Sequence, residues 1–226
     1  MPRYFALIPA AGVGTRMQTD VPKQYLPLRG KPMLAHAIDC LASVAAIEHV
    51  FVIASADDSH IDGLVLPPGR ATVLRVGGAT RQQSVRNGLQ AMRQQCTDAD
   101  WILVHDAARP GLTPALVTRL IDAIGDDPVG GLLALPVVDT MKRSDHGQRV
   151  HETVPRAGLW AAQTPQMFRS GVLQRALAMA ADMTDEASAV EALGLQPLLV
   201  HGSLRNMKVT LPEDAALVEI FLGMPQ

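Results

Sequence analysis

The chain has 226 residues, of which 48% are hydrophobic and 19% are charged. This balance is typical of a globular protein with a sizeable core, and it excludes a disordered chain or a small fold that depends on disulfides. A formal net charge of −2 argues against nucleic acid as a partner, because nucleic-acid binders usually carry a basic excess.

The cysteine content and the length of the apolar runs indicate where in the cell the protein is located. Cys40 and Cys96 form no C-x-x-C pair and no metal-ligand cluster, which favours two reduced, buried thiols. The first residues lack the charged leader and long apolar core of a signal peptide. No apolar run approaches the length of a membrane-spanning helix. We therefore expect a cytoplasmic protein without a membrane partner.

Short apolar runs alternate with amphipathic stretches along most of the chain. Unbroken apolar runs are typical of strands covered on both faces of a parallel sheet, whereas apolar residues three and four apart indicate helices. The pattern predicts, in chain order, a strand at Tyr4–Ile8, a helix around 33–41, strands at His49–Ala54 and Thr72–Val76, a helix at Ser84–Met92, a strand at Trp101–Val104, a helix at Ala115–Ile124, strands at Gly131–Leu135 and Pro197–Val200, and a helix at Ala215–Leu222. This order predicts an α/β fold with a doubly wound, mostly parallel sheet in one domain spanning residues 1–226.

Two of the predicted helices carry local start signals. Thr113 is a capping residue followed by Pro114, which suits the first helical position. Thr210 and Glu213 have the spacing of a capping box before the last helix.

Residues 136–160 break the alternation of strands and helices. Two extended segments, Asp139–Arg143 and Arg149–Val154, flank the turn Ser144–Gly147, which predicts a β-hairpin arm. An isolated hairpin is marginally stable. We therefore expect the arm to pack against a second subunit and form a homodimer; an ordinary surface loop is the alternative.

A glycine-rich loop, Pro9–Met17 (PAAGVGTRM), follows the first strand. Its small residues let backbone N–H groups cradle a phosphate at the carboxyl end of the strand. Met17 replaces the third glycine of a dinucleotide fingerprint, and the end of a P-loop is absent, which disfavours a dinucleotide-dependent oxidoreductase. Arg16 and Lys23 flank the cradle and suit a triphosphate and its leaving pyrophosphate. The alternative is a simple turn with two solvated cations.

Two further segments follow predicted strands. In His105–Pro110 (HDAARP), a carboxylate beside small residues suits Mg²⁺ or a ribose hydroxyl, and an ion pair between Asp106 and Arg109 is the structural alternative. Gly77–Val85 (GGATRQQSV) opens a helix, where Ser84 either contacts the edge of a pyrimidine base or caps the helix.

Together these motifs resemble a known family. Pro9–Arg16, Pro22–Gln24 (PKQ) and His105–Pro110 are similar to the signature of nucleotidyltransferases that activate sugar or polyol phosphates, specifically the 2-C-methyl-D-erythritol 4-phosphate cytidylyltransferases. The resemblance extends from the loop at residue 9 to residue 210. It implies a Rossmann-like nucleotidyltransferase fold, Mg²⁺ or another divalent cation, and transfer of CMP from CTP to 2-C-methyl-D-erythritol 4-phosphate in non-mevalonate isoprenoid synthesis.

The resemblance also implies roles for individual residues. The residues expected to act in catalysis are Arg16, Lys23, Arg156 and Lys208. Those expected to bind the nucleotide are Ala10, Ala11, Gly12, Gly14, Gly78, Ala79, Ser84, Asp106 and Ala107. Those expected to bind the polyol phosphate are Asp106, Arg109, Thr140, Arg156, Thr164, Thr184 and Lys208, with Arg156 and Thr164 coming from the partner subunit's arm. Asp106 is expected to act near Mg²⁺, with direct coordination left open.

This sequence departs from the family pattern at two positions. Residue 79 is often acidic in the family and is alanine here, so a backbone contact would survive and a side-chain contact would not. Pro155 is a milder departure in the segment before Arg156.

Two other functions remain open at this point. A cytidylyltransferase for another polyol phosphate, such as ribitol 5-phosphate, would share these motifs and differ around the acceptor pocket. A non-catalytic nucleotide-binding protein on the same fold is disfavoured because Arg16, Lys23, Asp106 and Lys208 are all present.

Overall fold

The computed structural model describes residues 2–12, 21–179 and 184–224. Gly14 and Arg16, which we expect to bind phosphate, lie outside the described residues. Within the described residues, no helix is long and apolar enough to cross a membrane.

A seven-stranded sheet forms the centre of the described structure, with the strand order β11-β7-β10-β6-β1-β4-β5. Its strands are β1 (Tyr4–Pro9), β4 (Ile47–Ile53), β5 (Ala71–Leu74), β6 (Trp101–Val104), β7 (Gly130–Pro136), β10 (Trp160–Arg169) and β11 (Leu198–His201). β10 runs antiparallel to both β6 and β7, and the other pairs in the sheet are parallel. The prediction of a mostly parallel α/β sheet is therefore confirmed.

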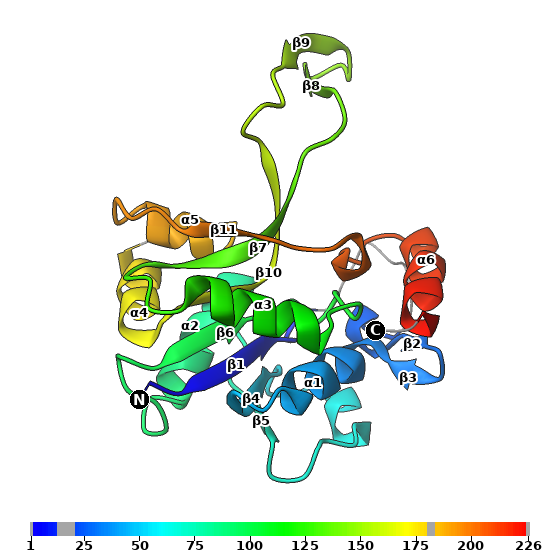
Figure 1. The fold of residues 1–226 in the computed structure, drawn as a ribbon. Helices are drawn as coiled ribbons and strands as arrows, with labels where there is room; N and C mark the ends of the chain where they lie inside the picture. Colours follow the sequence, from blue (N-terminus) through cyan, green and yellow to red (C-terminus); the bar gives the residue numbers. More distant parts are fainter. Residues whose placement is uncertain (1, 13–20, 180–183, 225–226) are drawn as a thin grey trace.

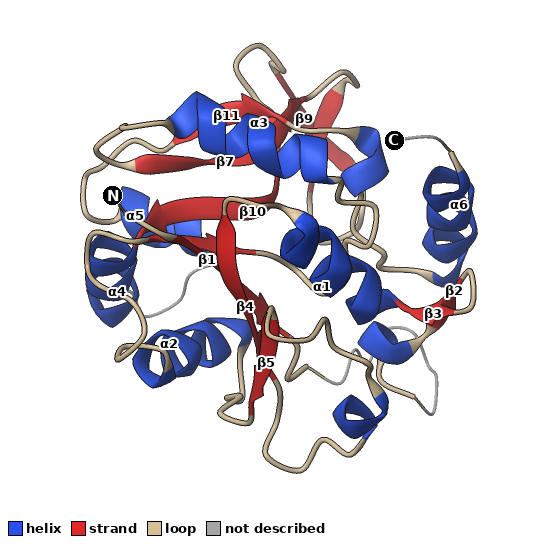
Figure 2. Cartoon of the chain, turned by 60° about the horizontal axis from the view of Figure 1, so that its bottom comes forward, coloured by secondary structure: helices blue, strands red, loops and turns tan. Residues whose placement is uncertain are grey.

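Helices cover both faces of the sheet (Figures 1 and 2). They are α1 (Met33–Ser43), α2 (Arg81–Ala91), α3 (Pro114–Ile124), α4 (Ser170–Met179), α5 (Glu186–Glu191) and α6 (Pro212–Gly223). Alternate residues of β1 serve the two faces: Ala6 and Ile8 pack in the core beneath α1 and α3, whereas Phe5 and Leu7 pack in the core beneath α2 and α4. The sheet is thus doubly wound, as the alternating pattern predicts.

Shorter elements lie around the sheet. A small antiparallel pair consists of β2 (Pro27–Leu28) and β3 (Lys31–Pro32), and 3₁₀ turns occupy Lys23–Tyr25, His60–Gly63 and Leu204–Asn206. The 3₁₀ turn at Lys23–Tyr25 follows the loop after β1 and places Lys23 beside the end of that strand.

Of the two helix starts predicted from capping residues, one is confirmed and the other is wrong. The Thr113 side chain caps α3 by accepting from Leu116 N, as predicted. The predicted Thr210–Glu213 capping box is wrong, because Leu211 is the cap of α6 and Pro212 is its first residue. The carboxylate that accepts from the N–H groups of Thr210 and Leu211, at 2.7 and 2.8 Å, is Asp214, one residue further along.

The predicted hairpin arm is present. β8 (Met141–Ser144) pairs antiparallel with β9 (Val150–Val154), and Figure 1 shows this pair held away from the central sheet by the extensions of β7 and β10. The arm presents apolar side chains to solvent, since Val138 is 73% exposed and Val150 is 65% exposed. Pairing with a second subunit stays a prediction.

Candidate functional site

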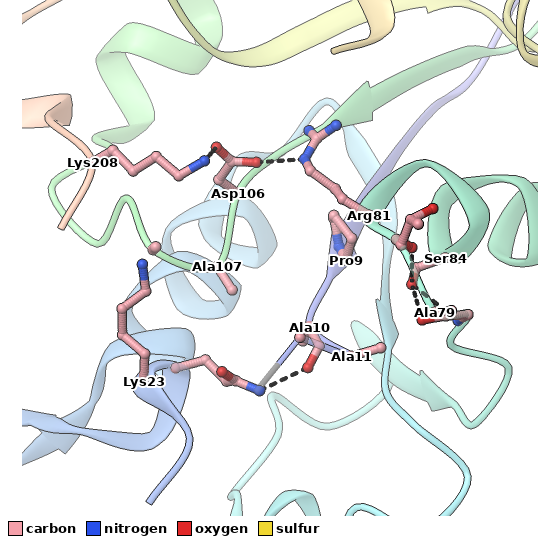
Figure 3. Close-up of a pocket in the computed structure, with 15 residues that line it drawn as sticks. Pro9, Ala10, Ala11, Lys23, Ala79, Arg81, Ser84, Asp106, Ala107 and Lys208 are labelled. Carbon is pink, nitrogen blue, oxygen red and sulfur yellow. Dashed lines mark hydrogen bonds and ion pairs between the residues drawn. The ribbon is translucent and has the colours of Figure 1, made fainter. Parts of the chain in front are cut away.

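The loops at the carboxyl ends of β1 and β6 meet the loop that opens α2. Because β1, β4 and β6 are parallel neighbours, their carboxyl ends share one edge of the sheet. Ala10 N donates to Ile53 O at 2.8 Å, and the Gln24 amide donates to Ala10 O at 2.8 Å, so the first residues of the loop after β1 are fixed from both sides. A cavity opens at this edge (Figure 3).

This cavity, which we call the nucleotide compartment, collects the expected nucleotide-binding residues. All eight of them that the structure describes line it: Ala10, Ala11, Gly12, Gly78, Ala79, Ser84, Asp106 and Ala107. Lys23 and Lys208 line it as well. The residues expected to contact the nucleotide are therefore brought together, although they come from distant parts of the chain.

A tight approach shapes the wall between β1 and α2. A Cβ placed on Gly77 would lie 2.4 Å from the Ala11 Cβ and 2.8 Å from Ala54 O, so only glycine fits there. Beyond it, Gly78 N donates to the Ser84 hydroxyl at 3.0 Å, and that hydroxyl donates to Thr80 O at 2.9 Å. Ser84 therefore shapes the loop before α2.

The sequence leaves open that Ser84 caps α2, and the structure shows that another residue does so. The Thr80 side chain accepts from Gln83 N and caps the helix, so Ser84 lies inside the first turn. Its side chain is buried, and its hydroxyl contacts the backbone of Gly78 on the wall of the nucleotide compartment. A contact between Ser84 and a base stays a prediction.

Lys23 and Lys208 reach the nucleotide compartment from a different side than Ser84. Lys23 Nζ donates to Val209 O at 2.7 Å, which joins the 3₁₀ turn to the segment that carries Lys208. Figure 3 shows both lysines across the cavity from Ala79 and Ser84. The two lysines thus face the loop that opens α2 across the cavity.

Asp106 lies at the centre of a buried cluster of charges. Its Oδ1 accepts from Arg81 Nε at 2.9 Å, and its Oδ2 accepts from Lys208 Nζ at 2.9 Å (Figure 3). Arg109 Nε lies 3.5 Å from the same Oδ2. Burial opposes ionisation of this carboxyl, but the neighbouring Arg81, Lys208 and Arg109 outweigh it and hold the pKa of Asp106 well below its usual range. Asp106 is therefore an anion at neutral pH.

The backbone of Asp106 is held by a chain of hydrogen bonds through His105 and Thr164. Arg109 O, 3.1 Å from His105 Nε2, has only lone pairs, so Nε2 carries the proton and donates. His105 Nδ1 then accepts from the Thr164 hydroxyl at 2.9 Å, and that hydroxyl accepts from Asp106 N at 3.0 Å. Burial lowers the pKa of His105 to about 4, so the ring stays neutral and keeps this tautomer.

The structure corrects the expected origin of Thr164. We expected this residue to reach the site from the partner subunit's arm, but it lies in β10 and is 3% exposed. Its hydroxyl is engaged by His105 and Asp106 of the same chain. Thr164 therefore belongs to the wall of its own subunit's site.

A second cavity, which we call the acceptor compartment, adjoins the first. Five of the residues expected to bind the polyol phosphate line it: Asp106, Arg109, Thr164, Thr184 and Lys208. The two compartments share Arg81, Asp106 and Lys208. The charge cluster around Asp106 is thus the boundary between them.

Two expected residues lie elsewhere among the described residues. Thr140 directly precedes β8 and Arg156 follows β9, both are exposed, and neither lines a described compartment of its own subunit. The Arg156 guanidinium donates to Val138 O.

Sequence reasoning missed two residues of the cluster, Arg81 and Glu186. Arg81 begins α2, and its terminal nitrogens donate to the two carboxylate oxygens of Glu186 at 2.7 and 2.9 Å. Glu186 begins α5 and is 1% exposed. The available signal was Arg81 itself, since a cation in the first turn of a helix opposes the helix dipole and needs anionic partners.

The described residues contain no group of three His, Cys, Asp or Glu side chains that could hold a metal ion. Asp106 is the carboxylate in the described lining of the nucleotide compartment, and each of its oxygens keeps a lone pair beside its bond to Arg81 or Lys208. Mg²⁺ commonly binds through one or two carboxylates plus substrate phosphates. The site therefore fits Mg²⁺ held mainly by the nucleotide.

Comparison with known proteins gives a consistent match. A family profile described as IspD, 2-C-methyl-D-erythritol 4-phosphate cytidylyltransferase, matches residues 4–224. Proteins of that name from Ralstonia nicotianae and Chromobacterium violaceum are 54% and 53% identical, with matches covering 98% and 96% of this chain and 92% and 97% of theirs.

Solved structures agree with the sequence relatives. A crystal structure of 4-diphosphocytidyl-2C-methyl-D-erythritol synthase superposes with a TM-score of 0.87 at 42% identity, over 98% of this chain and 99% of that one. The cytidylyltransferase from Thermus thermophilus superposes with a TM-score of 0.78 at 32% identity, over 99% of this chain and 100% of that one.

Proposed function

Because the chain belongs to the 2-C-methyl-D-erythritol 4-phosphate cytidylyltransferase family, we propose that its two compartments hold CTP and 2-C-methyl-D-erythritol 4-phosphate side by side. The protein is a cytidylyltransferase of isoprenoid precursor synthesis, since the family match and relatives above 50% identity cover nearly the whole chain. That match sets aside both a non-catalytic binding protein and a ribitol 5-phosphate enzyme.

The observation that carries the proposal is the shared boundary of the compartments. A nucleotide phosphate on one side and a phosphate monoester on the other would both face Lys208 and Arg81. Two anions repel each other, and cations placed between them reduce that repulsion. The boundary is therefore where the attacking oxygen and the α-phosphorus would meet.

We propose a direct in-line displacement at this boundary. An oxygen of the acceptor phosphate attacks the α-phosphorus of CTP, a new P–O bond forms, and the bond to pyrophosphate breaks. The acceptor phosphate is largely ionised at neutral pH, so no general base is needed. Catalysis then rests on positioning and charge neutralisation, as in other phosphoryl transfers.

The position of each described cation suggests which charge it would neutralise in this reaction. Lys23, beside the loop after β1, would contact the phosphate chain together with Arg16 and Gly14, while Lys208 would hold charge at the reacting centre. Arg109, which lines the acceptor compartment, would orient the nucleophile. A Mg²⁺ held by the nucleotide near Asp106 would neutralise further charge on the triphosphate.

We also propose that the arm of residues 136–160 joins two subunits. Its exposed apolar side chains support this, and so does the position of Thr140 and Arg156 away from their own compartments. Pairing through the arm would bring Arg156 of the partner subunit to the acceptor compartment. Sedimentation of the purified chain should then give the mass of a dimer.

Complementation between two inactive variants tests this arrangement. Co-expressed Lys208→Met and Arg156→Ala chains form mixed dimers in which one site has both defects and the other has neither. Activity recovered in the mixed dimer, with each parent inactive, is the expected result. Equal inactivity of the mixture would place Arg156 in its own subunit's site and remove the trans contribution.

Two wider assignments accompany the proposal. We infer that residues 1–226 form one nucleotidyltransferase domain, because both cores share the same sheet. We infer a cytoplasmic location from the two unpaired thiols, Cys40 and Cys96, since secreted proteins usually oxidise such residues.

Substrate selectivity provides the direct test of the function. Pyrophosphate release is measured with each of the four common nucleoside triphosphates, Mg²⁺, and either 2-C-methyl-D-erythritol 4-phosphate or ribitol 5-phosphate. We expect release with CTP and the methylerythritol acceptor, and little with the other pairs. Equal rates with ribitol 5-phosphate would contradict the acceptor assignment, and no release with CTP would contradict the proposed donor.

A further inference from the structure

Arg81 links parts of the molecule that serve different substrates. Its Nε donates to Asp106 at the boundary, and its two terminal nitrogens donate to Glu186. All of these bonds are between 2.7 and 2.9 Å. Each of the three guanidinium nitrogens therefore donates to one of two carboxylates, which fixes the plane of the group.

The Arg81–Glu186 pair also connects two loops. Arg81 follows the Gly78–Thr80 loop, which lines the nucleotide compartment. Glu186 follows Thr184 and Asp185, which line the acceptor compartment. The pair is thus a direct bridge between the loop at one substrate and the loop at the other.

The start of α5 is tied to the sheet by the side chain of one residue of β10. The Gln166 side chain in β10 donates to the Asp185 carboxylate at 2.8 Å and accepts from Ala187 N at 2.7 Å. Asp185 accepts from Ser188 N and caps the helix. Glu186 stands between these anchors, and each of its carboxylate oxygens accepts one hydrogen bond from Arg81.

We propose that Arg81 and Glu186 are positioning residues that couple the two compartments. Glu186 holds the Arg81 guanidinium at the boundary, where its charge faces both compartments, instead of letting it turn fully into one of them. This inference rests on the proposed function, in which both compartments receive anions. Binding of one substrate then favours binding of the other, and the coupling is reciprocal.

Loss of Glu186 should have a distinctive kinetic signature. With its terminal nitrogens released, Arg81 can turn into one compartment and pair with a phosphate there. Single-substrate binding would stay the same or tighten, whereas turnover would fall because the boundary loses its charge. Because the coupling is lost, the KM of each substrate, measured with the other saturating, should rise, and the decrease in kcat reports the charge missing from the boundary.

The test compares Glu186→Gln with wild type in two measurements. Calorimetry gives the Kd of a CTP analogue with a non-hydrolysable α,β-bridge, with and without 2-C-methyl-D-erythritol 4-phosphate. We expect the acceptor to tighten analogue binding about tenfold in wild type, within the usual range of coupling, and to have almost no effect in Glu186→Gln. Steady-state kinetics, measured with the other substrate saturating, should show a lower kcat and a KM raised by about the factor of the lost coupling.

Asp100→Asn is the matched control, because Asp100 is also a buried carboxylate that pairs with an arginine. It is 3% exposed and lies 2.9 Å from the Arg3 guanidinium, just before the amino end of β6 and far from the compartments. This variant should be less stable and yet keep the wild-type coupling and KM. A stability loss alone therefore cannot mimic the expected result.

Arg81→Lys serves as a second variant, because it keeps the cation and cannot bind Glu186 through two parallel bonds. It should also lose the coupling, and it decides the question if Glu186→Gln does not fold. Wild-type coupling and kcat in the folded variant would overturn the proposal. Failure of wild type to release pyrophosphate from CTP would instead overturn the proposed function, so the two failures are distinguishable.

Discussion

Replacing Lys208 by Met separates the chemistry of the site from its stability. The Lys208 side chain is 40% exposed, and its Nζ lies 2.9 Å from Asp106 Oδ2. Without it, Asp106 keeps Arg81 at 2.9 Å and Arg109 at 3.5 Å, so the carboxylate does not become an unpaired buried charge. A partly exposed ion pair contributes about 1 kcal/mol or less to the free energy of unfolding.

The expected effect on turnover is much larger than the effect on folding. Lys208 is one of the preorganised cations at the boundary of the two compartments. Removing one donor that faces the charge developing in a transition state typically lowers kcat about 100- to 1,000-fold. Lys208→Met should therefore be folded and almost inactive.

Lys31→Met provides the comparison. Lys31 is 44% exposed and pairs with the Asp39 carboxylate, but it lies in β3 and lines neither described compartment. Pyrophosphate release and urea unfolding are measured for both variants. Wild-type turnover of Lys208→Met would refute the role of Lys208, and a loss of activity matched by an equally large loss of stability would make that role structural.

Three further results are expected. Lys23→Met should lower kcat about 100-fold in the pyrophosphate assay with an unchanged circular dichroism spectrum, and an unchanged rate would remove Lys23 from the mechanism. Burial lowers the pKa of His105 from 6.5 to about 4. As the pH falls, the imidazole is therefore protonated in the unfolded chain before it is protonated in the folded one. This stabilises the unfolded chain, so about 3 kcal/mol of the free energy of unfolding that is present above about pH 6.5 should be lost by about pH 4. Urea unfolding at these two pH values should show a smaller loss of unfolding free energy for His105→Gln than for wild type. An equal loss in the two proteins would mean that other groups cause the pH dependence. Chelation of divalent cations should stop pyrophosphate release, and Mg²⁺ should restore it; release that persists in the chelator would exclude a required metal.

The strands and helices that the sequence predicts are those whose burial follows from local pattern. Trp101–Val104 is four apolar residues, buried on both faces, and the structure places β6 at the same positions. The start of α2 lies three residues before the predicted Ser84, because Thr80 caps the helix although no apolar residue marks that turn. Hydrophobic periodicity and capping residues therefore predict the presence of an element more accurately than they predict its first and last residues.

β10 escaped prediction because its burial depends on distant partners. It contains Gln163, Thr164 and Gln166, polar residues that read as a loop in sequence. In the fold, the Asn206 amide donates to Thr164 O at 2.7 Å, and Gln166 bonds to Asp185. These contacts satisfy the polar groups, and no local pattern contains that information.

The same distinction applies to the site. The nucleotide compartment is built from loops that follow strands, where a short motif and the rules of parallel sheets suffice to bring residues together. The acceptor compartment also depends on β10 and on the start of α5, so Thr164 and Thr184 emerged only through the family resemblance. Neither the motifs nor the family resemblance identified Arg81, since its partners Asp106 and Glu186 lie 25 and 105 residues away along the chain.

The charges of the site explain why a carboxylate stands among its cations. The described linings of the two compartments carry four cations, Lys23, Arg81, Arg109 and Lys208, and two carboxylates, Asp106 and Asp185. Glu186 behind them leaves an excess of one positive charge, in a chain whose net charge is −2. Without Asp106, Arg81 and Lys208 would repel each other across the boundary; with it, they stay there when no substrate is bound. The cations are then already in place when the anions arrive, so little reorganisation is needed during the reaction.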